Sequence, residues 1–215
     1  MLISHKHKFI CISIPKTGTR SLRETLCPLN ILDIIGHPTS TDFPQHGIAL
    51  ECKQSLENLG YNFDDYFSFC VVRNPWDRYL SFFKYYKERA EEYLKTTDFK
   101  EWKDLKIKQG KFASELFTNN NERFILKKII CRQRNQSEYF LNTREIIVSH
   151  IARFENLQNE FDYLCETIGL DKIQLSHGNK SINQISCSDI YNQELIDLVA
   201  EKEKEVIDLM SYVYK

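Results

Sequence analysis

Short apolar runs alternate with longer amphipathic segments along this chain. Residues 9–14 and 67–72 form nearly continuous apolar runs, which is typical of buried parallel strands. Strands that alternate with helices predict an α/β fold, with a central parallel sheet flanked by helices in a single domain over residues 1–215. The other predicted elements are helices at 20–26, 49–60, 75–90, 156–168 and 193–212, mostly helical residues between 98 and 130, and short strands at 31–35 and 145–148.

A polar loop at residues 15–19 separates the first apolar run from the helix that follows. The backbone N–H groups of such a loop and the N-terminus of the next helix point to one spot, which suits a phosphate or sulfate group. Lys16 adds a positive charge, and Thr17, Thr19 and Ser21 add hydroxyl donors. The lysine precedes the glycine, so this is not a Walker A loop, and nothing in it requires a metal ion. The alternative is an ordinary βα turn with an exposed lysine.

A second polar motif follows the apolar run 67–72. Arg73 stands at the end of the predicted strand, and Asn74-Pro75 has the N-cap and first-position residues of a helix. Ser81 lies two helical turns further on. A guanidinium at a strand tip and a hydroxyl on the helix could bind the same phosphate. The alternative is that Asn74-Pro75 only caps the helix and that Arg73 pairs with a carboxylate.

Together the two motifs resemble those of the PAPS-dependent sulfotransferases, in particular the carbohydrate-type branch, sulfotransferase family 2. Residues 15–22, P-K-T-G-T-R-S-L, are similar to the 5′-phosphosulfate loop of that family. Residues 72–81 are similar to its 3′-phosphate motif, R-[ND]-P-x-x-R-x-x-S. The resemblance runs from about residue 8 to the C-terminus, and Arg20 departs from the Thr or Ser usual at its position. Three later segments follow in the order of that branch, at 136–140, 153–157 and 177–181.

The resemblance implies transfer of a sulfuryl group from 3′-phosphoadenosine 5′-phosphosulfate (PAPS) to an acceptor hydroxyl, on a fold with a P-loop-like phosphosulfate-binding loop and without a metal. Lys16 would neutralise the charge that builds on the leaving phosphate. Arg73 and Ser81 would hold the 3′-phosphate, with Lys180 as a further candidate. The implied acceptor is a glycan or a small molecule. The implied ligands of the phosphosulfate group are Pro15, Lys16, Thr17, Gly18, Thr19, Arg20 and Ser21.

The acceptor hydroxyl needs a general base, and histidine is the natural choice near neutral pH. The family often carries a His-x-x-Ala element about 25 residues before the arginine of the second motif. His46, in the segment 46–49, matches that element in position. His37 is the second candidate and Glu51 a third.

The composition of the chain argues against several other classes of function. The formal net charge of −1 provides no basic field for non-specific nucleic-acid binding. The seven cysteines include no C-x-x-C pair, which indicates free thiols rather than a zinc site or a disulfide framework. No apolar stretch reaches the ~20 residues of a membrane span, so we expect a cytoplasmic protein. The alternative functions are a non-catalytic nucleotide-binding module and, less favoured, a P-loop nucleotide kinase.

Overall fold

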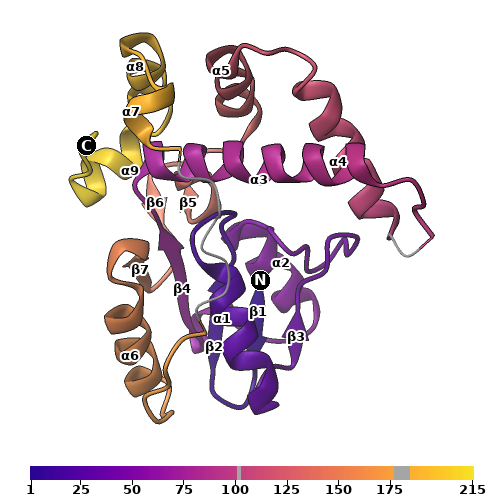
Figure 1. Ribbon diagram of the computed structural model, residues 1–215. Helices are drawn as coiled ribbons and strands as arrows, with labels where there is room; N and C mark the ends of the chain where they lie inside the picture. Colours follow the sequence, from indigo (N-terminus) through magenta and orange to yellow (C-terminus); the bar gives the residue numbers. More distant parts are fainter. Residues whose placement is uncertain (101–102, 177–184) are drawn as a thin grey trace. The chain divides into compact units, whose positions relative to one another are not determined.

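The computed structural model of the protein describes residues 1–100, 103–176 and 185–215 (Figure 1). The chain folds into two compact units. The first holds Met1–Asn74 and Arg134–Lys180, and the second holds Pro75–Gln133 and Ser181–Lys215. Each unit is therefore built from two separate segments of the chain. Within the described ranges, no helix is long and apolar enough to span a membrane.

A five-stranded mixed sheet in the order β3-β1-β2-β4-β7 forms the centre of the first unit. Strands β2 (Phe9–Ile12), β4 (Phe67–Val72) and β7 (His150–Arg153) run parallel, which confirms the predicted α/β fold with parallel strands. Strand β1 (Leu2–Ser4) runs antiparallel to both β2 and β3 (Ile34–Ile35). The sheet is therefore mixed rather than wholly parallel.

The edges of the sheet differ from the prediction. Strand β1 was not predicted, because three residues are too few to show a period. The strand expected at 145–148 is only β6 (Glu145–Ile146), which pairs with β5 (Leu141–Asn142) in a separate hairpin. The fifth strand of the sheet is β7, whose half-buried residues do not form the apolar run expected of a strand covered on both faces.

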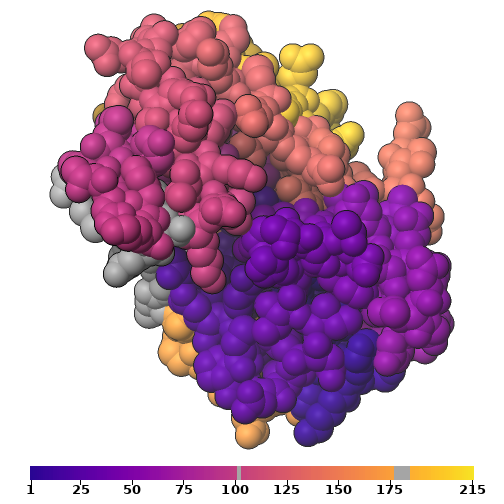
Figure 2. All heavy atoms as spheres, turned by 90° about the vertical axis from the view of Figure 1, so that its right-hand side faces the viewer, coloured from indigo at the N-terminus to yellow at the C-terminus, as the bar shows by residue number. Residues whose placement is uncertain are grey.

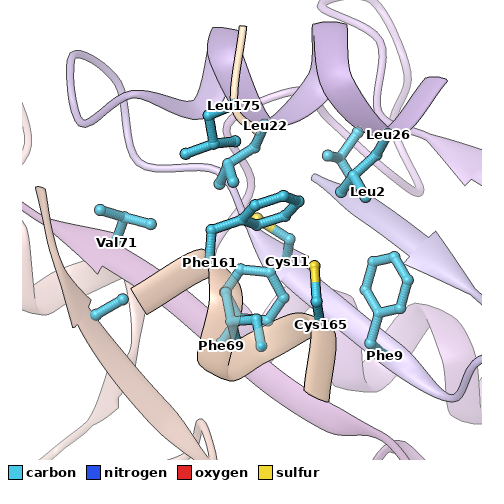
Figure 3. Close-up of a cluster of buried hydrophobic side chains, with 12 residues drawn as sticks. Leu2, Phe9, Cys11, Leu22, Leu26, Phe69, Val71, Phe161, Cys165 and Leu175 are labelled. Carbon is cyan, nitrogen blue, oxygen red and sulfur yellow. The ribbon is translucent and has the colours of Figure 1, made fainter. Parts of the chain in front are cut away.

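Helices α1 (Thr19–Leu26) and α6 (Leu157–Thr167) cover one face of this sheet, and α2 (Ala49–Asn58) follows β3. Side chains of β2, β4, α1 and α6 meet in one buried cluster (Figure 3). Alternate residues of each strand face this cluster, as the pleat requires. Its members include Phe9, Cys11, Leu22, Leu26, Phe69, Val71, Phe161, Leu164 and Cys165. Four short 3₁₀ helices complete the described elements of this unit: η1 (Cys27–Leu29), η2 (Phe63–Asp65), η3 (Ser137–Tyr139) and η4 (Phe154–Asn156).

The second unit is helical in the described ranges. Its long helix α3 (Pro75–Lys95) packs against α4 (Asp104–Leu116) and α5 (Glu122–Arg132). The C-terminal segment adds α7 (Cys187–Ile190), α8 (Gln193–Lys202) and α9 (Lys204–Met210). The helix predicted at 193–212 is thus interrupted at Glu203.

A buried ion pair lies at that interruption. The guanidinium of Arg78 on α3 donates to Glu203 Oε1 at 2.9 Å, and both side chains are wholly buried. The Tyr79 hydroxyl donates to the same oxygen at 2.9 Å. Burial and the neighbouring Glu203 carboxylate raise the pKa of Tyr79. The carboxylate therefore joins α3 to the junction of α8 and α9.

All seven cysteines have free thiols, as predicted, and four of them are buried. Burial raises the pKa of Cys11 to about 11 and that of Cys52 to about 12. These thiols stay protonated near neutral pH and pack as small apolar side chains.

Candidate functional site

The loop between β2 and α1 turns through two residues with left-handed backbone. Lys16 has a φ of 69°, which is uncommon for a residue other than glycine. Gly18, the N-cap of α1, has a φ of 84°. A Cβ atom at Gly18 would lie 2.7 Å from Leu157 Cδ2 and 3.0 Å from the Phe154 ring. Glycine is therefore required here both by backbone conformation and by lack of space.

The start of α1 presents backbone donors. The first N–H groups of a helix have no intrahelical acceptor, and at this helix they belong to Thr19, Arg20 and Ser21. The N-cap residue, Gly18, has no side chain that could accept a hydrogen bond from these N–H groups. The helix dipole places partial positive charge at the same point. The loop geometry is therefore suited to an anion.

Two predicted ligands of the phosphosulfate group have other partners. The Thr17 hydroxyl donates to the Ile14 carbonyl at 2.9 Å, and its side chain is wholly buried. It therefore stabilises the loop, and only the backbone N–H of Thr17 stays available as a ligand. The Arg20 guanidinium donates to Glu24 Oε1 at 2.6 Å, in an i,i+4 pair whose arginine side chain is 65% exposed. Its charge is thereby partly neutralised along the exposed face of α1.

The second motif meets the loop at Arg73. Its guanidinium lies 4.3 Å from the centre of the Phe154 ring, and Nη1 donates to the Lys16 carbonyl at 3.4 Å. The Phe154 ring also lies next to Gly18, 3.0 Å from where a Cβ atom of that residue would be. The first unit therefore brings Lys16, Gly18 and Arg73 together at the carboxyl ends of β2 and β4.

Two later segments hold the backbone of this motif. The Arg73 N–H donates to Gln136 Oε1 at 2.9 Å, and Gln136 Nε2 donates to the Arg73 carbonyl at 2.9 Å. The Asn74 N–H donates to Glu155 Oε1 at 2.7 Å. The Gln136 side chain is wholly buried. The sequence resemblance included Gln136 and Glu155 without giving them a role, and the structure shows that they fix the end of β4.

His46 lies beside the same end of β2. Its Nδ1 donates to the Ser13 carbonyl at 2.7 Å, two residues before the loop begins at Pro15. With the proton on Nδ1, the lone pair of a neutral imidazole is on Nε2, the nitrogen that can act as a base.

The other two candidate bases, His37 and Glu51, form hydrogen bonds with residues close to them in the sequence. His37 is exposed, and its Nδ1 bonds to Thr39 Oγ1 at 2.8 Å within the same turn. Glu51 Oε2 accepts from the Ile48 N–H at 3.1 Å, which caps the start of α2. His46, in contrast, contacts Ser13, which lies two residues before the loop.

The remaining predicted residues lie elsewhere. Ser81 is half-buried on α3, in the second unit, whereas Arg73 belongs to the first. Lys180 and the segment 177–181 lie outside the described residues.

The comparison with family sequence models agrees with these motifs. A sequence model described as "Sulfotransferase family" matches residues 1–213. No curated protein matches the chain. The crystal structure of a sulfotransferase from Alicyclobacillus acidocaldarius is similar to 96% of this chain and 96% of its own, at 14% sequence identity and a TM-score of 0.38.

Proposed function

Because the chain belongs to the sulfotransferase family, we propose that it transfers a sulfuryl group from PAPS to a hydroxyl of a carbohydrate acceptor. The observation that supports this most directly is the contact between the two motifs, where Arg73 Nη1 donates to the Lys16 carbonyl. It joins a loop suited to one phosphate-like group to an arginine suited to another. PAPS carries two such groups, at its 5′ and 3′ positions.

The 5′-phosphosulfate occupies the loop in this proposal. The backbone N–H groups of residues 17–21 and the start of α1 hold its non-bridging oxygens. Pro15 starts the loop and Gly18 allows its close turn. Arg73 binds the 3′-phosphate, stiffened by its contact with the Phe154 ring, and Ser81 adds a hydroxyl donor.

The reaction is an in-line displacement at sulfur. The acceptor oxygen forms a bond to sulfur while the bond between sulfur and the bridging phosphate oxygen breaks. Lys16 stabilises the negative charge that develops on the leaving phosphate. His46 Nε2 takes the proton of the acceptor hydroxyl, and its Nδ1–H bond to Ser13 holds the ring in that tautomer. No metal ion is needed, since the loop and Lys16 supply positive charge.

Calorimetry with adenosine 3′,5′-bisphosphate and 5′-AMP tests the donor assignment. The bisphosphate should bind at least tenfold more tightly, because a charge-assisted hydrogen bond contributes about 1.5–3 kcal/mol. Arg73→Ala should remove this preference, and Ser81→Ala should reduce it. Arg144→Ala, which removes an exposed arginine of the first unit, is the matched control. Equal affinities of the unchanged protein for the two nucleotides would contradict the proposal.

A screen of glycans and small alcohols with radiolabelled donor identifies the acceptor. Transfer to a glycan should persist in EDTA. Donor binding without transfer to any acceptor would favour the non-catalytic alternative. Activity that EDTA removes and magnesium restores would favour the kinase alternative.

A further inference from the structure

All residues that line one cavity belong to the helical second unit. The cavity measures about 620 Å³ and is walled by α3, α4 and α5. This volume is ordinary for a small-molecule site. Figure 2 shows the surface that α4 and α5 form in this unit, coloured pink. None of the proposed donor or catalytic residues lines the cavity. Its apolar wall consists of Tyr86, Phe112, Leu116, Phe124 and Ile129.

Two cations lie on the aromatic rings of this wall. Lys128 and Arg132 are one turn apart on α5, and Phe124 is one turn before Lys128, so the three share a face of the helix. Lys128 Nζ lies 4.6 Å from the centre of the Phe124 ring. The Arg132 guanidinium lies 4.2 Å from the centre of the Phe112 ring. The rings thus hold both charges beside the apolar wall.

The charges at the cavity do not cancel. In the described part of the chain, neither Lys128 nor Arg132 has an ion pair with a carboxylate. Lys127, the third cation, is paired with Glu194 at 2.5 Å. Glu115 is the one acidic residue among the described residues that line the cavity. An apolar pocket with two unpaired cations therefore has a net positive rim.

We propose that this cavity binds a small molecule with a flat or chain-like apolar body and a single anionic group, such as a carboxylate or a sulfonate. The body packs against Phe112, Leu116 and Phe124. The anion lies at Lys128 and Arg132, which offer it two charge-assisted contacts. The inference does not depend on the proposed sulfotransfer, because it rests on the second unit alone.

Two fluorescent probes with the same ring system test the proposal. 8-Anilinonaphthalene-1-sulfonate carries a sulfonate, and N-phenyl-1-naphthylamine lacks it. The sulfonate probe should bind saturably at one site and at least tenfold more tightly than the neutral probe. Adenosine 3′,5′-bisphosphate should not displace it. Displacement by the bisphosphate, or equal binding of the two probes, would overturn the proposal.

Variants locate the site. The double change Lys128→Glu and Arg132→Glu should weaken sulfonate binding at least tenfold and change neutral binding less than twofold. The matched control, Lys108→Glu with Lys111→Glu, changes the same charge at exposed positions of α4 outside the cavity. Phe112→Ala should weaken both probes. If the charge reversal prevents folding, as judged by circular dichroism, replacement of the same two residues by glutamine serves instead. Unchanged sulfonate binding in the folded double variant would refute the assignment.

Discussion

Replacing Gly18 by alanine tests how the loop at the start of α1 is built. Two separate effects are expected at this residue. Its φ of 84° is left-handed, and its missing Cβ would approach Leu157 Cδ2 to 2.7 Å. Gly60 and Gly169 have nearly the same backbone, with φ of 82° and 71°, but nothing lies within 4 Å of a Cβ atom there. The three positions therefore separate backbone strain from close contact.

The magnitudes follow from these two effects. An alanine in left-handed backbone costs about 1–2 kcal/mol. An extra carbon forced into a packed site costs about 1–3 kcal/mol more. Gly60→Ala and Gly169→Ala should therefore lower the free energy of unfolding by about 1–2 kcal/mol, and Gly18→Ala by about 2–5 kcal/mol. At roughly 2–4 °C per kcal/mol for a chain of this size, the Tm should fall by about 2–8 °C and about 4–20 °C respectively.

Thermal unfolding followed by circular dichroism measures the three variants. Gly18→Ala should also weaken binding of adenosine 3′,5′-bisphosphate, because the clash with α6 displaces the loop amides. The two control variants should bind it normally. If Gly18→Ala proves no less stable than Gly60→Ala, the contacts of residue 18 with Leu157 and Phe154 do not exclude a Cβ atom, and the reasoning is refuted. If Gly18→Ala is destabilised but binds the bisphosphate normally, the loop amides are not ligands of the nucleotide.

Three further outcomes are expected. Glu203→Gln should lower the free energy of unfolding by about 3–5 kcal/mol, since it breaks the buried ion pair between Arg78 and Glu203; thermal unfolding checks this, and a loss below 1 kcal/mol would contradict it. Gln136→Ala should weaken binding of adenosine 3′,5′-bisphosphate at least fivefold in calorimetry, because two backbone groups lose their partner. His46→Ala should lower turnover by about 10²–10⁴-fold, whereas His37→Ala should change it little, and the reverse order would transfer the role of the base to His37.

Elements with a strong local signal could be predicted from the sequence. Strand β4 was predicted at its observed bounds, and α1 and α6 within one residue at each end, because buried runs and apolar periods determine them. The interruption at Glu203 could not be predicted. A glutamate within an amphipathic pattern is expected to be exposed, whereas Glu203 is buried and accepts hydrogen bonds from Arg78 and Tyr79, which lie 125 and 124 residues away.

The candidate site likewise has features that could be predicted from the sequence and features that could not. The loop and Arg73 could be predicted from their position at the ends of apolar runs. The i,i+4 pairing of Arg20 with Glu24 was visible in the sequence and was missed. The support that Gln136 gives to Arg73 was not visible, because it depends on a contact between residues 63 positions apart.

The pairing of β4 with β7 also has a consequence for synthesis of the chain. Ser68 and Ser149, which bond to each other where these strands begin, are 81 residues apart, and the segment between them builds most of the second unit. At about 5–20 residues per second, the ribosome needs roughly 4–16 s to make that stretch. During this interval the β7 side of β4 is an open edge of largely apolar residues, which can pair with other chains. A nascent chain of this protein therefore exposes this edge to aggregation after β4 emerges and before β7 does.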